Sequence, residues 1–279
     1  MANEIPVFII SHERAETMTT YEVLNACGYT GQIFIVIDDK DKQIDLYREL
    51  YKEKIIVFSK DEVSRKCDTM DNFKVYTSAL YARVFCWHKA KELGYQQIVV
   101  CDDDITNFCI RYVKDEKLKY SKIKDLNTII RILGDFLAKT GIAAIGPVWE
   151  NSLHGGKNGS FREGLIPNTA QFEMVNIGCN NVQKWRGTRC EDEMFLIDNW
   201  NAGNPVYVVT TLAFGCPKRM EGDGGLQSDY AMVNKWILDS YFFMAYPGGY
   251  QCTTEKIKRC KPNLFPKVIS EKWRKKSCR

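Results

Sequence analysis

The sequence predicts an α/β protein, a three-layer sandwich built on a mostly parallel central sheet. Short runs rich in β-branched residues alternate along the chain with segments whose apolar residues recur at helical spacing. Several of these runs end directly on carboxylates, where the loops that follow strands form a ligand crevice in such sheets. The chain has 279 residues and is 45% hydrophobic, enough to bury a full core.

The first part of the chain predicts repeated β-α units. The expected strands are Ile5–Ile10, a run within Gln32–Asp41, Ile55–Phe58 and Gln97–Cys101. The expected helices are Ala15–Ala26 before Gly28 and Gly31, Gln43–Lys52, and Phe73–Leu93 before Gly94.

The second part continues the alternation less regularly. The expected strands are Phe108–Val113, Ile142–Gly146, Gln171–Gly178 and Pro205–Thr210, and the expected helices are Ile123–Lys139, Cys190–Trp200 and Ser228–Tyr241. A glycine-rich stretch, Leu153–Ser160, predicts a mobile loop. We therefore expect one domain over 1–253, with halves of about 1–112 and 113–253, and a separate tail over 254–279.

Composition excludes several protein classes. The 11 cysteines are odd in number, scattered and without a CxxC pair, and there are three histidines far apart, which favours reduced thiols over a disulfide framework or a structural zinc site. No apolar run approaches the length of a membrane helix, and the first residues do not look like a secretion signal. The expectation is a soluble, cytoplasmic protein that contacts no membrane.

The tail carries most of the positive charge. Residues 254–279 contain ten Lys or Arg and two Glu, a net charge of +8, whereas the whole chain is +4 and the rest is therefore −4. Local basicity of this kind is typical of a polyanion contact, although a solvated terminal extension would also explain it. The candidate nucleic-acid contacts are Lys256, Lys258, Arg259, Lys261, Arg274, Lys275 and Lys276.

Three consecutive aspartates, Asp102, Asp103 and Asp104, follow an expected strand and should project into the crevice. In extended backbone, the side chains of Asp102 and Asp104 would point the same way and offer two oxygen ligands to Mg²⁺ or Mn²⁺, which would in turn hold a diphosphate. The alternative is an ordinary loop in which the triplet caps a helix or is solvated.

Other charged residues lie where they could meet the same ligand. Asp38 and Asp39 end the second strand, where a carboxylate could accept hydrogen bonds from a base or ribose, or form a helix-entry turn. Ser11 and Arg14 follow the first strand, and Arg83 lies on the helix before the triplet, where a surface ion pair is the competing explanation.

The order of these pieces resembles a known enzyme family. SHERAETM, VIDDKD, an arginine before VVCDDDI, and a downstream CEDEMF together resemble the GT-A nucleotide-sugar glycosyltransferases over about residues 5–215. VFIISHERAETM, CDDDI and EDE look most like the TET/JBP-associated group, phage and kinetoplastid enzymes that glycosylate hydroxymethylpyrimidines in DNA.

The resemblance implies a GT-A-type, Rossmann-like fold and assigns roles to particular residues. It implies that Asp102 to Asp104 are the DxD-type site, that Arg83 is the arginine before it, and that Asp192 of the ED motif is the catalytic base. Glu191 and Asp192 open an expected helix, where capping would also explain them. Many GT-A enzymes add a C-terminal histidine to the metal, but no histidine follows His154 here.

The resulting prediction is an inverting, metal-dependent transferase. It moves a hexose from a UDP-sugar to the hydroxymethyl group of 5-hydroxymethylcytosine or 5-hydroxymethyluracil in DNA, with Asp192 as base and Glu191 beside it. Mn²⁺ or Mg²⁺ acts on the leaving diphosphate, with Lys218 or Arg219 adding positive charge. Two alternatives stay open: a glycan, lipid or protein acceptor, and a nucleic-acid-binding module with a structural metal site.

Overall fold

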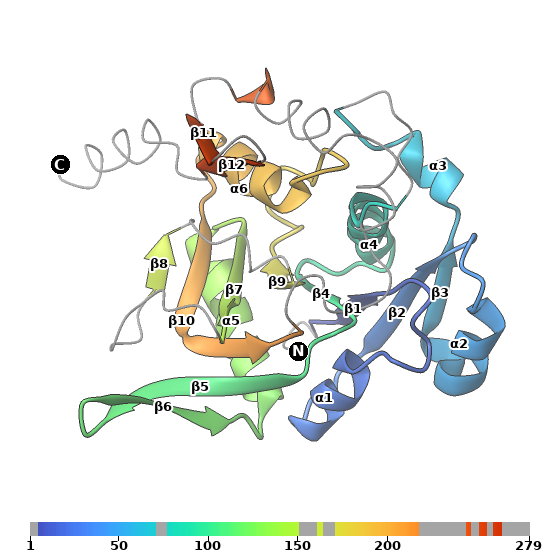
Figure 1. Ribbon diagram of the computed structural model, residues 1–279. Helices are drawn as coiled ribbons and strands as arrows, with labels where there is room; N and C mark the ends of the chain where they lie inside the picture. Colours follow the sequence, from blue (N-terminus) through green and yellow to red (C-terminus); the bar gives the residue numbers. More distant parts are fainter. Residues whose placement is uncertain are drawn as a thin grey trace.

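A computed structural model of the protein describes residues 5–70, 77–150, 161–163, 171–217, 244–246, 251–255 and 259–263. Its centre is a 10-stranded sheet in the order β3-β2-β1-β4-β9-β7-β10-β5-β6, with β8 paired to β10 (Figure 1). The strands are β1 Val7–Ile10, β2 Ile33–Asp38, β3 Ile55–Phe58, β4 Ile98–Asp102, β5 Asn107–Lys114, β6 Lys117–Lys122, β7 Ala144–Trp149, β8 Phe161–Glu163, β9 Phe172–Val175 and β10 Val206–Gly215.

The two parts of the sheet differ in strand direction. In the first part, β3, β2, β1 and β4 are all parallel. In the second, β9 runs antiparallel between β4 and β7, and β5 runs antiparallel to β10 and β6. Because β7 and β10 are again parallel, seven of the ten described strands point one way, so the predicted mostly parallel sheet is confirmed.

Helices cover both faces and complete three layers. The helices are α1 Thr20–Ala26, α2 Ile44–Tyr51, α3 Lys60–Ser64, α4 Leu80–Glu92, α5 Leu126–Thr140 and α6 Glu191–Asn201, with a 3₁₀ turn, η1, over Lys52–Lys54. Strand side chains alternate between the faces: Val7 and Ile9 join the core that α1, α2 and α5 cover, whereas Phe8 and Val100 join the core under α4 and α6.

The longest helix follows from local signals in the sequence. Asp125 caps α5 by accepting a hydrogen bond from the Thr128 N–H, and Gly141 ends it in a left-handed conformation with φ of 68°. Its buried face places Leu126, Ile130 and Leu133 on the sheet. This helix agrees with the predicted Ile123–Lys139 to within a few residues.

Two helices begin later than predicted. Residues before Thr20 form turns rather than the first turns of α1, because the Thr19 and Thr20 N–H groups donate to the Asp103 carbonyl and the Thr20 hydroxyl donates to the Asp102 carbonyl. α4 begins at Leu80 instead of Phe73, and residues 77–79 before it are not helical. Tertiary contacts with the aspartate triplet therefore replace local helix formation before α1.

Several elements were not predicted, and some predictions fall outside the described residues. The unpredicted elements are η1, α3, which Ser59 caps by accepting from the Glu62 N–H, strands β6 and β8, and the two-stranded sheet of β11 Gln251–Glu255 and β12 Arg259–Asn263. This pair spans the predicted boundary at 253/254. The glycine-rich loop Leu153–Ser160 and the helix Ser228–Tyr241 lie outside the described residues. None of the described helices has the length and apolarity needed to cross a membrane.

Candidate functional site

The carboxyl ends of β1, β2 and β4 bring the predicted donor-side residues to one edge of the sheet. β1 lies between β2 and β4, and Ile10 is in register with Val36 on one side and Asp102 on the other. Ser11, Asp38 and the aspartate triplet therefore follow adjacent strands. This is the edge at which open α/β sheets bind ligands.

Asp103 is held firmly by other side chains. The Ser11 hydroxyl donates to its Oδ2 at 2.5 Å and Arg14 Nη1 donates to its Oδ1 at 2.8 Å, while the Asp103 residue is buried. Ser11 Oγ also lies 2.6 Å from the Tyr47 hydroxyl. Both carboxylate oxygens of Asp103 are thus engaged within the protein, which fixes the shape of the loop after β4.

The other two aspartates are less completely satisfied. Asp102 receives a hydrogen bond from Arg83 Nη2 at 3.1 Å, and burial raises its pKa to about 6, with Asp104 and Asp103 adding to the effect against Arg83. Asp104 Oδ1 is buried without a hydrogen-bond partner among the described residues, and burial followed by the charge of Asp103 raises the pKa of Asp104. Both groups would gain from a nearby cation.

Arg83 links the triplet to the ED motif. Its side chain is only 3% exposed, and Nε lies 3.6 Å from Glu191 while Nη2 contacts Asp102. The surface ion pair considered from sequence is therefore wrong, because this arginine is buried in the site. Burial alone would lower its pKa, but Asp102, Glu191, Glu173 and Asp192 raise it.

Glu173 was missed in the sequence. It lies on β9, opposite Val100 of β4, and it is buried with Oε2 unbonded to any described group. Burial raises the pKa of Glu173 to about 8 and that of Glu191 to about 7. A glutamate in an apolar run was the only signal, and nothing local placed it beside β4.

The ED motif opens α6 as predicted. Asp192 Oδ1 accepts a hydrogen bond from the Glu193 N–H at 2.9 Å, and Cys190, in a left-handed conformation with φ of 54°, precedes the helix. Glu191 to Glu193 all lie in the first turn, where carboxylates also interact favourably with the helix dipole. Through Arg83, this helix end and the end of β4 form one acidic site.

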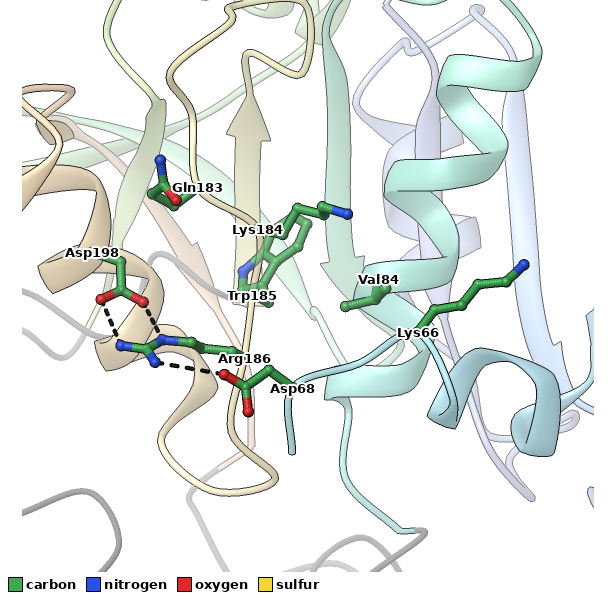
Figure 2. A pocket seen from close by; sticks show the side chains of 8 residues that line it. All are labelled: Lys66, Asp68, Val84, Gln183, Lys184, Trp185, Arg186 and Asp198. Carbon is green, nitrogen blue, oxygen red and sulfur yellow. Dashed lines mark hydrogen bonds and ion pairs between the residues drawn. The ribbon is translucent and has the colours of Figure 1, made fainter. Parts of the chain in front are cut away.

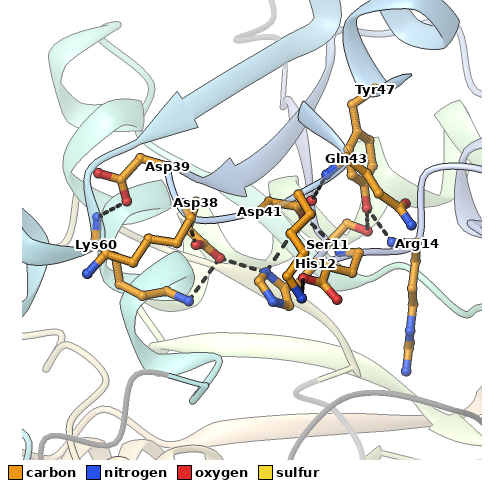
Figure 3. A network of polar contacts seen from close by, with 12 residues as sticks. Ser11, His12, Arg14, Asp38, Asp39, Asp41, Gln43, Tyr47 and Lys60 are labelled. Atoms are coloured by element: carbon orange, nitrogen blue, oxygen red, sulfur yellow. Dashed lines mark hydrogen bonds and ion pairs between the residues drawn. The ribbon is translucent and has the colours of Figure 1, made fainter. Parts of the chain in front are cut away.

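Asp38 is fully occupied by groups that were not predicted. Its Oδ2 lies 2.8 Å from His12 Nδ1 and 2.9 Å from Lys60 Nζ, and its Oδ1 accepts from the Lys40 N–H (Figure 3). Burial would raise its pKa, but hydrogen bonds from His12 and Lys60 outweigh burial and lower the pKa to about 2. The neighbouring Asp39 accepts a hydrogen bond through Oδ1 from the Lys60 N–H at the start of α3, a long-range contact that was not predicted.

A family model for the TET-associated glycosyltransferases matches residues 5–225. The chain belongs to this family. It is a glycosyltransferase of the GT-A type, as predicted from the motifs. No curated protein matches the chain.

Solved structures share the fold of this TET-associated glycosyltransferase at low identity. Glucosyl-3-phosphoglycerate synthase from Mycobacterium tuberculosis, in complex with Mn²⁺, UDP-glucose and phosphoglyceric acid, is 8% identical with a TM-score of 0.51, covering 93% of this chain and 86% of its own. The complex of that enzyme with UDP is 10% identical with a TM-score of 0.50, covering 95% and 87%. These likenesses establish the fold.

A cavity of about 460 Å³ lies beside the acidic site of the glycosyltransferase, between the segment after α3, helix α4 and the segment before α6 (Figure 2). Trp185 lines it and stacks on Phe195 of α6. Arg186 forms a two-point ion pair with Asp198 at 2.5 and 2.9 Å, which ties the segment to α6. The cavity and the acidic site thus share α4, whose Val84 lines the cavity next to Arg83.

Some predicted site residues are not placed by the structure. Lys218 lies outside the described residues, as do Lys256, Lys258, Arg274, Lys275, Lys276 and the predicted neighbours Arg219 and His154. Arg259 and Lys261 belong to β12, of which only the backbone is described. In the parts of the chain that are described, no three His, Cys, Asp or Glu side chains gather as metal ligands.

Proposed function

We propose that this enzyme transfers a hexose from a UDP-sugar to the hydroxymethyl group of a 5-hydroxymethylpyrimidine in DNA, with inversion at the sugar carbon. One observation carries the proposal: the buried Arg83 contacts both Asp102 at the end of β4 and Glu191 at the start of α6. One buried side chain therefore links the proposed donor site to the helix turn that carries the candidate base, Asp192. The proposed metal and donor ligands lie at the end of β4, and the candidate base lies on α6.

The residues present fit a divalent cation. Six carboxylates, from Asp102 to Asp104, Glu173, Glu191 and Asp192, interact electrostatically with the guanidinium group of Arg14 or Arg83. Asp104 Oδ1 is buried and unbonded within the described structure. Asp102 and Asp104 would supply two ligands, and diphosphate and water oxygens the rest, as is common for Mg²⁺. Bound there, Mn²⁺ or Mg²⁺ would stabilise negative charge on the leaving diphosphate.

UDP-sugar is the proposed donor. The glucosyl-3-phosphoglycerate synthase structures with the same fold contain UDP or UDP-glucose, one of them with Mn²⁺. Arg14, only partly exposed and anchored to Asp103, is placed to contact the diphosphate from the β1 side. Ser11 follows β1 and Asp38 ends β2 on the same side of the proposed donor site. We assign contact with the nucleoside to the residues next to them, including His12.

Asp192 is the proposed catalytic base. An inverting transfer needs a carboxylate on the face of the sugar opposite the leaving group, where it takes the proton from the attacking hydroxyl. Asp192 lies in the first turn of α6 next to Glu191, which Arg83 links to Asp102 of β4. Glu191 Oε1 lies 3.6 Å from Arg83 Nε, and because this ion pair engages Glu191 we assign it a positioning role beside the base.

DNA is the proposed acceptor because the chain belongs to the TET-associated family and carries a tail of net charge +8. A hydroxymethylated base in a duplex must leave the stack to reach a recessed site, so the protein must also hold the phosphate backbone. A site at the edge of the sheet could receive such a base, and a basic segment could hold the phosphates.

Direct analysis of the product tests this function. The protein is incubated with Mn²⁺, a panel of UDP-hexoses and DNA containing 5-hydroxymethylcytosine or 5-hydroxymethyluracil, and the DNA is digested to nucleosides for mass spectrometry. We expect one nucleoside to gain a hexose, and unmodified DNA to gain none. UDP release onto another acceptor with unchanged DNA nucleosides would reject the DNA acceptor and keep the glycosyltransferase.

A further inference from the structure

We infer that the β5–β6 ribbon, Asn107 to Lys122, is a DNA-binding arm that holds the phosphate backbone of the acceptor duplex. The inference rests on the proposed DNA acceptor and names a surface for it within the folded domain. It concerns residues outside both the triplet and the predicted basic tail. Four features of the ribbon carry it.

The ribbon leaves the body of the sheet. β5 pairs with β10 from Asn107 to Ile110, opposite Leu212 to Gly215. Beyond Ile110, the described pairing of β5 is with β6 alone, and the ribbon projects from the molecule in Figure 1. Lys114 and Lys117 are paired at its tip, next to a two-residue turn at Asp115 and Glu116 with φ of 53° and 56°.

The ribbon is rooted at the active site. Asn107 comes three residues after Asp104, and the Thr106 N–H donates to the Gly215 carbonyl at 2.8 Å. From this root β5 runs for eight residues, roughly 25 Å at the usual rise of a strand. Duplex DNA advances about 3.4 Å per base pair, so the ribbon spans roughly seven base pairs from the reacting base.

The ribbon exposes lysines together with large hydrophobic side chains, two of them tyrosines. Four of the eight large hydrophobic side chains exposed on the described surface lie on it: Ile110, Tyr112, Val113 and Tyr120. Its four lysines, Lys114, Lys117, Lys119 and Lys122, are also exposed, and none forms an ion pair with any described residue. With Arg111, Asp115 and Glu116, the ribbon has a net charge of +3, although the chain without its tail is net −4.

One face of the ribbon concentrates these groups. Cross-strand partners share a face, so the pairs Tyr112–Lys119 and Lys114–Lys117 put three lysines and a tyrosine together. Directly opposed like charges destabilise a strand pair. Lysines on an edge strand also block edge-to-edge aggregation, which would account for β6 but not for Lys114 or the exposed Tyr112 on β5. Binding to a polyanion would account for both Lys114 and the exposed Tyr112.

The test measures DNA binding by the full chain, without catalysis. Fluorescence anisotropy with a labelled 20-base-pair duplex is recorded over a salt series for the wild type and for Lys114→Gln/Lys117→Gln/Lys119→Gln. We expect the Kd of this variant to rise about tenfold and the slope of log Kobs against log salt to fall by about 2.7, since each lost phosphate contact removes about 0.9. A matched variant, Lys52→Gln/Lys54→Gln/Lys139→Gln, changes three lysines away from the ribbon and should leave the slope near that of the wild type.

Separate readouts distinguish the possible failures. If the ribbon variant keeps the salt slope of the matched variant while circular dichroism shows both folded, the ribbon is not a DNA arm. If the ribbon variant instead loses self-association in gel filtration with DNA binding unchanged, the surface joins two copies of the chain, and the inference is also overturned. If the protein transfers no hexose but the ribbon variant still binds DNA more weakly, the proposed reaction is rejected and the DNA-binding arm is retained. UDP-sugar hydrolysis without DNA should be equal in both variants.

Discussion

Two groups of carboxylates lie at the same edge of the central sheet, and the protein completes them to different degrees. On the β1–β2 side, Asp38 and Asp103 have both oxygens bonded, and the pKa of Asp38 falls to about 2. On the β4–β9–α6 side, Asp102, Glu173 and Glu191 share Arg83, and burial raises their pKa values to about 6, 8 and 7. The carboxylates of the first group are hydrogen-bonded within the protein, whereas burial disfavours the charged form of the carboxylates in the second group.

The difference separates the carboxylates that stabilise the fold from those that are available for catalysis. Fully bonded carboxylates fix the loops after β1 and β2 and gain little from a ligand. Buried carboxylates with raised pKa values bind a cation or accept a proton more readily, which is the behaviour expected of an active site. Replacing the proposed base on the β4–β9–α6 side should therefore lower activity far more than replacing Asp38 on the β1–β2 side.

The largest effect is expected from the proposed base. Asp192→Asn should lower kcat by about 10²-fold to 10⁴-fold, the usual contribution of a general base, and should leave UDP-sugar binding unchanged. Single-turnover transfer assays and calorimetric titration of UDP-sugar measure the two quantities. Asp38→Asn is the comparison from the scaffold side, and an equal loss of kcat there would remove the distinction between the two groups.

Arg83 should show the largest effect on stability. Arg83→Met leaves at least two buried carboxylates without their cation, and breaking a buried ion pair from one side costs about 3 to 5 kcal/mol of unfolding free energy. Urea denaturation measures this cost. The double variant Arg83→Met/Glu191→Gln should recover part of it, because the two side chains interact. Strict additivity of the two single changes would show that the contact carries no energy.

The pH dependence of stability should have opposite signs on the two sides. Glu173, Glu191 and Asp102 have raised pKa values, so their protonated forms favour the folded state below about pH 4, and this contribution is lost as pH rises through about 6 to 8. The unfolding free energy lost in this way is on the order of 3 to 5 kcal/mol for each group, because one pKa unit corresponds to about 1.4 kcal/mol. Asp38, with its lowered pKa, stabilises the fold above about pH 4 and loses that effect as pH falls toward about 2.

Thermal melts between pH 5 and pH 8 measure this trend in metal-free protein. We expect Tm to fall with rising pH, and Mn²⁺ to raise Tm more at pH 8 than at pH 5, because the cation competes with protons for the carboxylates. Asp104→Ala should abolish the response to Mn²⁺, whereas Asp45→Ala, at an exposed carboxylate on α2, should preserve it. A response to Mn²⁺ that survives Asp104→Ala would place the cation elsewhere.

The smallest effect is expected at His12. Its side chain is 46% exposed, so removing the ion pair with Asp38 in His12→Ala should cost less than about 1 kcal/mol. A hydrogen bond to Asp38 raises the pKa of His12, so the contribution is present below about pH 6.5 and is lost as pH rises through the higher folded value. Urea denaturation at pH 6 and pH 9 checks both points, and an equal cost at the two pH values would contradict the ion pair.

Local patterns predicted the parts of the fold that local physics decides. The apolar runs that became β1 to β4 and the capped helix α5 were placed within a few residues, because burial and capping read directly from side-chain spacing. The first turns of the predicted helix before α1 were wrong, since the backbone there donates to Asp103 instead. Strand β6, with alternating lysines, carried too little apolar signal to be seen.

The candidate site likewise has one part that local sequence predicts and another that only tertiary contacts determine. By itself, the sequence determined that Asp102 to Asp104 follow a buried strand and that Glu191 and Asp192 open a helix, because strand ends and helix starts are set by neighbouring residues. Only the tertiary structure decided that Arg83 is buried between them, that Glu173 joins them, and that His12 and Lys60 occupy Asp38. These contacts join residues far apart in the chain, and the antiparallel insertion of β9 beside β4 that creates the acidic side has no local signature.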